Sequence, residues 1–316
     1  MRKLFNVLRC LCRSYCVVPP GYSIPPDSLH IVQSRPPRIG GFADVWRGEY
    51  TQPDGRRVDV AIKHIRVNPW EASTIHPKVC QEIILWRRLS QHPRITPMIG
   101  IDRHLFPLCI VSKWMAHGDI MSFLRQSPDS NRLQLLIDVC EGLQHLHSQS
   151  VAHGDIKACN VVVDSKSRAN LCDFGLSTLI HSVNSMNPST QSNEKSPGTT
   201  LYMAPELMDP ERYGLKYSHV SLEADVYALG LVMWEVFAGR EPWGSLRGLY
   251  SNLKVARAVL EGQRPPRPPA AAGLPSHTAD DVWDLIQRCW RQQWRERPRI
   301  EEVLRSLTEA AARQLP

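Results

Sequence analysis

The chain has 316 residues, which allows one large domain or two small ones, and its 38 basic and 31 acidic residues give a net charge of +7. This charge indicates a mildly basic globular protein rather than a nucleic-acid-binding one, because no basic run is interleaved with aromatic residues. Nine scattered cysteines in mostly apolar segments favour buried thiols over a disulfide framework, and no apolar run reaches the roughly 18 residues of a membrane-spanning helix.

Residues 1–27 differ from the rest of the chain. The segment is basic and partly apolar, its first acidic residue is Asp27, and its proline pairs predict a linker. A disordered leader, or an amphipathic extension packed on the next domain, is the favoured interpretation. Two alternatives stay open: a mitochondrial presequence, and a membrane-surface helix whose cysteines accept palmitoyl groups.

The next part of the chain is rich in predicted strands. Residues 42–50 and 58–65 carry β-branched and aromatic residues around the turn at 53–55, which predicts a hairpin. A helical period follows over 78–89, and a further strand is predicted at 105–114. The first third of the chain therefore reads as a small β-rich region with one helix.

The remainder is predicted to be mainly helical, with one more short hairpin. The predicted helices are 133–147, 226–238, 279–290 and 300–311, and the hairpin strands are 161–163 and 169–172. The segment 226–238 is apolar nearly all round but too short to span a bilayer, so it is predicted to be a buried central helix.

Two short stretches carry the chemistry: residues 153–160, His-Gly-Asp-Ile-Lys-Ala-Cys-Asn, and residues 173–175, Asp-Phe-Gly. Together they offer a base in Asp155, a cation in Lys157 and two oxygen ligands for a divalent metal in Asn160 and Asp173. These are the groups needed to move a phosphoryl group from ATP to a hydroxyl.

With Val-Ala-Ile-Lys at 60–63 upstream and Ala-Pro-Glu at 204–206 downstream, the two stretches match the protein-kinase signature set. The chain resembles a eukaryotic-type protein kinase domain from about Leu29 to about Leu307. Residues 198–206 and 261–265 resemble the tyrosine-kinase-like group, most members of which phosphorylate serine and threonine.

The resemblance implies an α+β, bilobal protein-kinase fold: a small β-rich N-lobe with one helix and a larger, mainly helical C-lobe. On this basis the kinase domain is expected over 28–312. The N-lobe is expected at about 28–112, the hinge at 113–118 and the C-lobe at 119–312.

The resemblance also assigns roles to the catalytic residues. Asp155 is expected to act as the catalytic base, and Lys157 to neutralise charge on the γ-phosphate. Lys63 is expected to contact the α- and β-phosphates, paired with Glu82. Glu82 falls on the apolar face of the predicted helix, where a carboxylate is costly unless it is paired. Trp86, one turn further on, is either a core residue or a contact of Phe174.

The expected cofactors are ATP and Mg²⁺, with Asn160 and Asp173 as the metal ligands. The nucleotide-binding residues implied are Ile39, Gly40, Gly41, Val45, Ala61, Lys63, Lys113, Met115, Asn160 and Asp173. The phosphate-covering loop departs from the family pattern. Only Gly40 of its three glycines is kept, with Gly41 beside it, so weaker ATP binding is expected.

These features predict a cytoplasmic serine/threonine kinase that uses ATP and Mg²⁺ to phosphorylate proteins. A pseudokinase scaffold is the alternative, favoured only by the degenerate glycine loop. A small-molecule kinase is disfavoured, because residues 198–206 resemble a peptide-docking segment. Three further residues are expected to be structural: Glu206 and Arg297 as a buried ion pair, and Asp225 as the holder of the catalytic-loop backbone.

Overall fold

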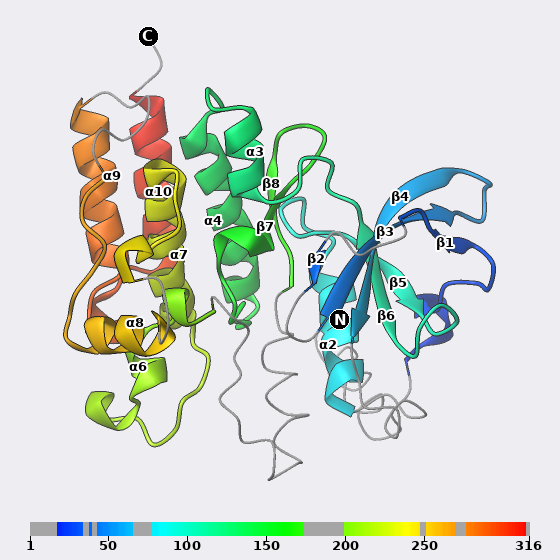
Figure 1. Ribbon diagram of the computed structural model, residues 1–316, viewed down its shortest axis with the longest axis horizontal. Coiled ribbons are helices and arrows are strands. Elements are labelled where there is room, and N and C mark those ends of the chain that lie inside the picture. The colour runs from blue at the N-terminus through cyan, green and yellow to red at the C-terminus, as the bar shows by residue number, and fades with distance from the viewer. Residues whose placement is uncertain are drawn as a thin grey trace. The chain divides into compact units, whose positions relative to one another are not determined.

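The computed structural model describes residues 18–33, 38–39, 43–65, 77–173, 199–246, 251–268 and 276–313. The described residues up to Met115 belong to one compact unit, and those from Ala116 onward belong to a second (Figure 1). The first unit is built around a β-sheet and the second is mainly helical, which is the division expected for the α+β, bilobal kinase fold.

The first unit contains an antiparallel sheet in the order β1-β3-β4-β6-β5, with β2 pairing on β3. The strands are β1 (Leu29–Ile31), β2 (Arg38–Ile39), β3 (Ala43–Thr51), β4 (Arg57–Ile65), β5 (Met98–Asp102) and β6 (Cys109–Lys113). The β3–β4 hairpin is the predicted one, and Gly55 in its turn has a φ of +83° that favours glycine. Val60 and Ile62 of β4 are fully buried.

The strand predicted at 105–114 is shorter than expected and is preceded by a strand that was not predicted. Residues 103–108 form bends, and the pairing segment begins only at Cys109. The carboxylate of Asp102 accepts bonds from the N–H groups of His104 and Leu105, which closes a turn. Pro107 follows, and it has no N–H to donate to a ladder.

Residues 20–31 are packed onto the sheet rather than extended as a linker. A short 3-10 helix (Pro20–Tyr22) precedes a bridge between Ser23 and Ile101, and β1 then pairs with β3. Ile24 and Leu29 are each 4% exposed and lie in a cluster with Val60, Ile62 and Val111. The prolines in this stretch therefore turn the chain along the sheet, and apolar burial outweighs the linker-like composition.

The second unit contains most of the helices and a short hairpin. They are α3 (Ile120–Gln126), α4 (Arg132–Ser148), α6 (Pro205–Met208), α7 (Leu222–Ala238), α8 (Ser251–Leu260), α9 (Ser276–Cys289) and α10 (Ile300–Ala312), with strands β7 (Val161–Val163) and β8 (Ala169–Leu171). Helix α10 packs on α4, α9 packs on α7, and β8 packs on α4.

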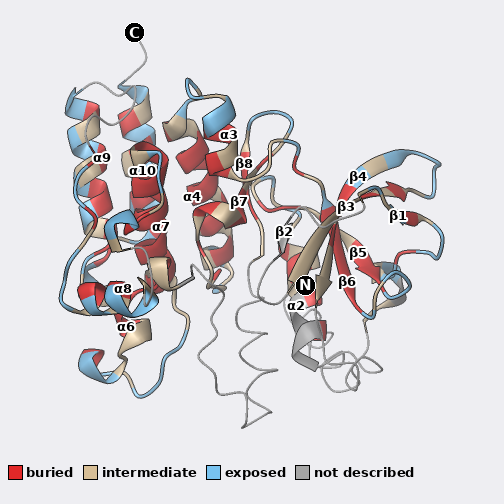
Figure 2. Cartoon of the chain, in the orientation of Figure 1, coloured by how far each residue is buried: buried red, intermediate tan, exposed pale blue. Residues whose placement is uncertain are grey.

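Helix α7 is the buried centre of the second unit, as its apolar sequence predicted. Every residue from Ala224 to Phe237 is buried (Figure 2). Ser221 caps its first turn by accepting the N–H of Ala224, and Gly239 ends it at a φ of +66°. Within the described ranges, none of the helices combines the length and apolar character that a bilayer crossing needs.

Candidate active site

The predicted catalytic loop folds around the carboxylate of Asp155. The Nζ of Lys157 lies 2.7 Å from its Oδ2, and Asn160 donates from Nδ2 to the same oxygen at 2.9 Å and to the Asp155 carbonyl at 2.8 Å. Burial disfavours the charged form of Lys157, but nearby negative charge, that of Asp155 first, outweighs it and raises the Lys157 pKa. The Asp155 side chain is thereby held in one orientation.

The backbone of this loop is fixed from below by Asp225 of α7. Its two carboxylate oxygens accept the N–H groups of His153 at 2.7 Å and Gly154 at 2.8 Å. His147 adds a third bond, with Nε2 at 3.0 Å from Oδ2. Asp225 therefore does what the resemblance implied, and Gly154 adopts a φ of +80° that a glycine accepts without strain.

The His153 side chain joins the catalytic loop to the segment that carries Asp173. Its Nδ1 lies 3.3 Å from the Asp155 N–H, and its Nε2 lies 3.0 Å from the Cys172 carbonyl oxygen. These partners fit a neutral ring that accepts at Nδ1 and donates at Nε2. Burial lowers the His153 pKa, more than the surrounding carboxylates raise it, so the neutral form is favoured.

The two candidate metal ligands are brought together by the backbone. The Cys172 N–H donates to the Asn160 carbonyl at 3.0 Å. Asp173 is the next residue in the chain, so it lies one residue from this backbone contact with Asn160. Asp173 has a φ of +63°, an uncommon conformation for a side chain other than glycine. The described residues hold no group of three or more His, Cys, Asp or Glu side chains able to bind a metal ion. Two oxygen ligands fit Mg²⁺, which commonly takes one or two protein ligands beside phosphates and water.

Three of the predicted nucleotide contacts in the first unit share one face of the sheet. Val45 pairs with Lys63 in register, and Ala61 pairs with Ser112. Directly opposed residues, and residues two apart on a strand, point to the same side, so Val45, Ala61 and Lys63 lie on one face. The buried residues Val60 and Ile62 lie on the other.

The remaining nucleotide-binding predictions fall at strand ends or outside the described residues. Lys113 ends β6 and donates its N–H to the Pro97 carbonyl, and Met115 lies two residues beyond. Ile39 lies in β2 and Glu82 in α2 (Pro77–Leu89), but the side chains of both are outside the described set, as are Gly40, Gly41 and Phe174 altogether. Trp86 is buried and donates its indole N–H to the Thr96 carbonyl at 3.1 Å.

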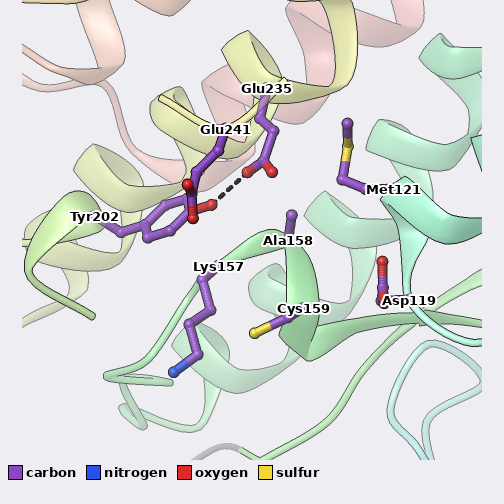
Figure 3. Close-up of a pocket in the computed structure, with 8 residues that line it drawn as sticks. All are labelled: Asp119, Met121, Lys157, Ala158, Cys159, Tyr202, Glu235 and Glu241. Carbon is purple, nitrogen blue, oxygen red and sulfur yellow. Dashed lines mark hydrogen bonds between the residues drawn. The ribbon is translucent and has the colours of Figure 1, made fainter. Parts of the chain in front are cut away.

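A small pocket that the sequence did not predict opens beside Lys157. It has a volume of about 180 Å³ and lies within the second unit (Figure 3). Its lining residues are Asp119, Met121, Lys157, Ala158, Cys159, Tyr202, Glu235 and Glu241. The Tyr202 hydroxyl donates to Glu235, and burial raises the Glu235 pKa to about 7. A single carboxylate within the apolar run 226–238 was the only signal for this pocket in the sequence.

Glu206 and Arg297 form the buried ion pair that the resemblance implied. Both Nη groups of Arg297 bond the two carboxylate oxygens of Glu206 at 2.7 Å. The two side chains are 3% and 0% exposed, and Arg297 also donates to the carbonyls of Glu223 and Arg291. A paired guanidinium with four hydrogen bonds braces α6 against the chain that precedes α10.

The antiparallel sheet, the helical unit and the Asp155 loop define the class as a eukaryotic-type protein kinase domain. The family model "Protein tyrosine and serine/threonine kinase" matches residues 38–307. Because this match covers most of the chain, the chain belongs to that family, as the resemblance predicted.

Curated relatives with kinase names align over most of the chain. It is 27% identical over 276 residues to the serine/threonine-protein kinase STY46 of Arabidopsis thaliana, covering 86% of this chain and 43% of that protein. It is 29% identical to the serine/threonine/tyrosine-protein kinase HT1 of Arabidopsis thaliana (88% and 66%) and 28% identical to the human cytoplasmic tyrosine-protein kinase BMX (83% and 34%). The chain therefore spans less than two thirds of the length of each of these relatives.

Proposed function

We propose that this chain is an active protein kinase that transfers the γ-phosphoryl group of ATP to serine and threonine hydroxyls of proteins in the cytoplasm. The observation that carries the proposal is the Asp155 carboxylate held between Lys157 Nζ at 2.7 Å and Asn160 Nδ2 at 2.9 Å. A charge pair of this kind, in a loop whose backbone is anchored to Asp225 by two N–H groups, is preorganised for proton and phosphoryl transfer.

In this proposal Asp155 orients the attacking hydroxyl and accepts its proton late in the transfer. Lys157 neutralises negative charge that develops on the transferred group. Asn160 and Asp173 would hold Mg²⁺, which supplies charge neutralisation on the phosphates when it is bound. His153 keeps the two segments in register, because its ring contacts both the Asp155 N–H and the Cys172 carbonyl.

The first unit would bind the nucleotide. Val45 and Ala61, which share a sheet face with Lys63, are suited to contact the adenine ring from that face, and Lys63 to contact the α- and β-phosphates. The backbones of Lys113 and Met115 would hydrogen-bond the adenine edge, and Ile39, Gly40 and Gly41 would cover the phosphates. Glu82 is assigned as the partner of Lys63 from its position in α2.

Serine and threonine specificity rests on Lys157 and Thr199, which follow the serine/threonine kinase pattern, and on relatives whose names include that activity. Because one of the relatives is named a tyrosine-protein kinase, tyrosine is the alternative phosphate acceptor to test. A pseudokinase would lack transfer altogether. The kinase names of the relatives, and the presence of Lys63, Glu82, Asp155, Asn160 and Asp173, favour catalysis.

The test is transfer of labelled phosphate from ATP by the purified chain to a mixed peptide library, in Mg²⁺, with the Asp155→Asn variant as the matched control. Label that appears on serine and threonine and depends on Asp155 supports the proposal. Label mainly on tyrosine would overturn the specificity, and label that is absent, or equal in the variant, would favour the pseudokinase scaffold.

A further inference from the structure

The segment from Pro19 to Ile31, called the N-terminal strap below, crosses one face of the sheet from edge to edge. At the β5 edge the Ile24 N–H donates to the Ile101 carbonyl at 2.9 Å, and Ser23 bridges Ile101. At the other edge β1 pairs with β3, from Leu29 opposite Tyr50 to Ile31 opposite Gly48 (Figure 1). The strap is thus hydrogen-bonded to both margins of the sheet that carries Lys63.

Two glycines show how closely the strap lies on the strands. A Cβ placed on Gly100 would come within 2.6 Å of the Tyr22 carbonyl oxygen, and one placed on Gly48 within 2.6 Å of the His30 carbonyl oxygen. Both contacts are with backbone atoms, which do not swing aside as a flexible side chain would. The sheet is therefore shaped to accept the strap as a fixed layer.

The strap also reaches helix α2 through Arg87. The β5–β6 register shifts between Met98 and Gly100, which leaves Ile99 outside the regular ladder. Nη1 of Arg87 donates to the carbonyls of both Met98 and Ile99, at 2.6 Å for Met98. The irregular strand therefore presents two carbonyls to the last turn of α2, and one guanidinium binds both.

Tyr22 of the strap lies against that guanidinium. The Cζ of Arg87 is 5.8 Å from the centre of the Tyr22 ring, within the range of a cation–π contact. The neighbouring residue on the helix, Trp86, bonds the Thr96 carbonyl through its indole N–H. Two adjacent residues therefore bond the end of α2 to β5 and to the chain leading into it, and the Tyr22 ring lies against one of them.

We propose that Arg87 and Tyr22 are positioning residues, through which the N-terminal strap fixes helix α2 and with it Glu82. The part of the proposal that concerns transfer rests on the proposed function, in which Glu82 pairs with Lys63. Arg87 lies five residues after Glu82 on the same helix, so motion of the last turn also moves the turn that carries the carboxylate. The strap thereby helps to position Lys63, through Glu82, for its contact with the ATP phosphates. It does so although it lies outside the matched family segment.

The experiment compares two changes at one position in the full chain. Tyr22→Leu removes the aromatic face, whereas Tyr22→Phe keeps it, and Arg56→Gln serves as a control because Arg56 belongs to an exposed ion pair in the β3–β4 turn. Amide hydrogen exchange is followed over 83–89 and over β3 and β4, and phosphoryl transfer is measured on the same samples. In Tyr22→Leu we expect exchange over 83–89 to accelerate about two- to fivefold, the range for one cation–π contact, with a comparable fall in transfer. Tyr22→Phe and Arg56→Gln should match the original protein.

Each other outcome overturns a defined part of the proposal. Equal exchange over 83–89 in Tyr22→Leu and Tyr22→Phe would mean that the ring does not hold α2. Acceleration spread evenly over β3 and β4 would mean that the strap only stabilises the sheet. Faster hydrogen exchange in α2 with an unchanged transfer rate would mean that Tyr22 and Arg87 do not position Glu82 for the reaction. If the original protein shows no transfer, the proposed function fails and the transfer part fails with it, while the exchange data still decide whether the strap holds α2.

Discussion

Three polar groups meet at Asp155, and each comes from a residue with a different task. Lys157 supplies a positive charge, and the side-chain amide of Asn160 donates to one carboxylate oxygen. The Nδ1 atom of His153 accepts the backbone N–H of Asp155. The loop thus holds its carboxylate through both side chain and main chain. An aspartate restrained in this way loses little conformational entropy when it adopts a reactive geometry.

The first prediction at this scale concerns the two charges assigned to the reaction. Asp155→Asn removes the base and Lys63→Met removes the phosphate cation, and each is expected to lower the transfer rate by at least about a hundredfold. Initial rates at saturating ATP are the measurement. The exposed Glu261→Gln is the control, and full activity in either site variant would contradict the assignment.

The second prediction concerns Gly154, which stands where many kinases carry an arginine. That arginine binds a phosphate on the activation loop, which is expected between Gly175 and Ala204 and lies largely outside the described residues, and glycine has no side chain to do so. We therefore expect basal activity to survive removal of loop phosphate. The initial rate is measured after treatment with a phosphatase and removal of the phosphatase. A fall beyond about tenfold, or roughly 1.4 kcal/mol of barrier, would mean that another basic residue reads the phosphate.

The grouping of Asp155, Lys157 and Asn160 was predictable because these residues lie within one stretch of eight residues and the chemistry needs a fixed spacing, while their catalytic roles stay predictions. It did not predict the Tyr202–Glu235 bond, whose partners lie on η5 (Thr199–Tyr202) and α7 and are 33 residues apart. Contacts of this kind depend on how the chain packs at long range, and local periodicity does not encode them.

At the scale of elements, α7 combines an almost wholly buried surface with two buried carboxylates, Asp225 and Glu235. Asp225 at its start is satisfied by two backbone N–H groups and by His147, whereas Glu235 near its end accepts from the Tyr202 hydroxyl and, among the described residues, has no cation bonded to it. The difference appears in the raised pKa of Glu235, about 7, whose first cause is burial. The same helix therefore buries one acid with three hydrogen-bond partners, Asp225, and one with a single hydroxyl partner in the described part of the chain, Glu235.

The third prediction follows from the Glu235 pKa, which burial raises from 4.5 to about 7. Between these values the folded chain binds more protons than the unfolded chain, so this group lowers stability as pH rises. Glu235→Gln keeps an acceptor for Tyr202 and removes the charge. Relative to the original protein, we expect it to gain about 2 kcal/mol more at pH 8 than at pH 5.

The measurement is urea unfolding of both proteins at the two pH values, with Glu261→Gln as an exposed control that should show no such difference. If Glu235→Gln changes stability by the same amount at pH 5 and pH 8, the buried charge is not the cause and the effect is one of packing.

Elements with strong local signals were predictable, and those whose form depends on other parts of the chain were not. The β3–β4 hairpin and the helices α4, α7 and α10 follow from turn residues and apolar period. Strands β1 and β5 are short or irregular and gain their stability from pairing with longer neighbours, so residues 29–31 and 98–102 carried little signal. The short helix α3 depends on its Asp119 cap, which resembles an ordinary turn residue in the sequence.

The described part of the chain forms two units with different secondary structure, and each carries residues assigned to the proposed function. The sheet unit carries Val45, Ala61 and Lys63, and the helical unit carries the Asp155 loop and Asp173. Neither unit alone holds all the residues assigned to transfer. Activity is therefore expected to require both units, with ATP bound together with Mg²⁺ as the ligand.

The fourth prediction concerns that ligand. A non-hydrolysable ATP analogue with Mg²⁺ should raise the melting temperature of the chain, because a ligand that binds only the folded state at about 100 times its Kd adds about 2.7 kcal/mol. Chelation with EDTA should reduce this shift and abolish transfer, while the melting temperature without nucleotide stays unchanged. An undiminished shift in EDTA would show that Asn160 and Asp173 do not hold a metal needed for nucleotide binding.

The strap has a practical consequence for anyone who prepares shortened forms of this protein. A fragment that starts at residue 38, where the family match begins, would lack Ile24 and Leu29 and would uncover the apolar surface around Val60, Ile62 and Val111. It would also leave one margin of β3 without its neighbour β1. Bare apolar surface next to an open strand edge promotes self-association, so such a fragment should precipitate on expression where one that begins at residue 18 stays in solution.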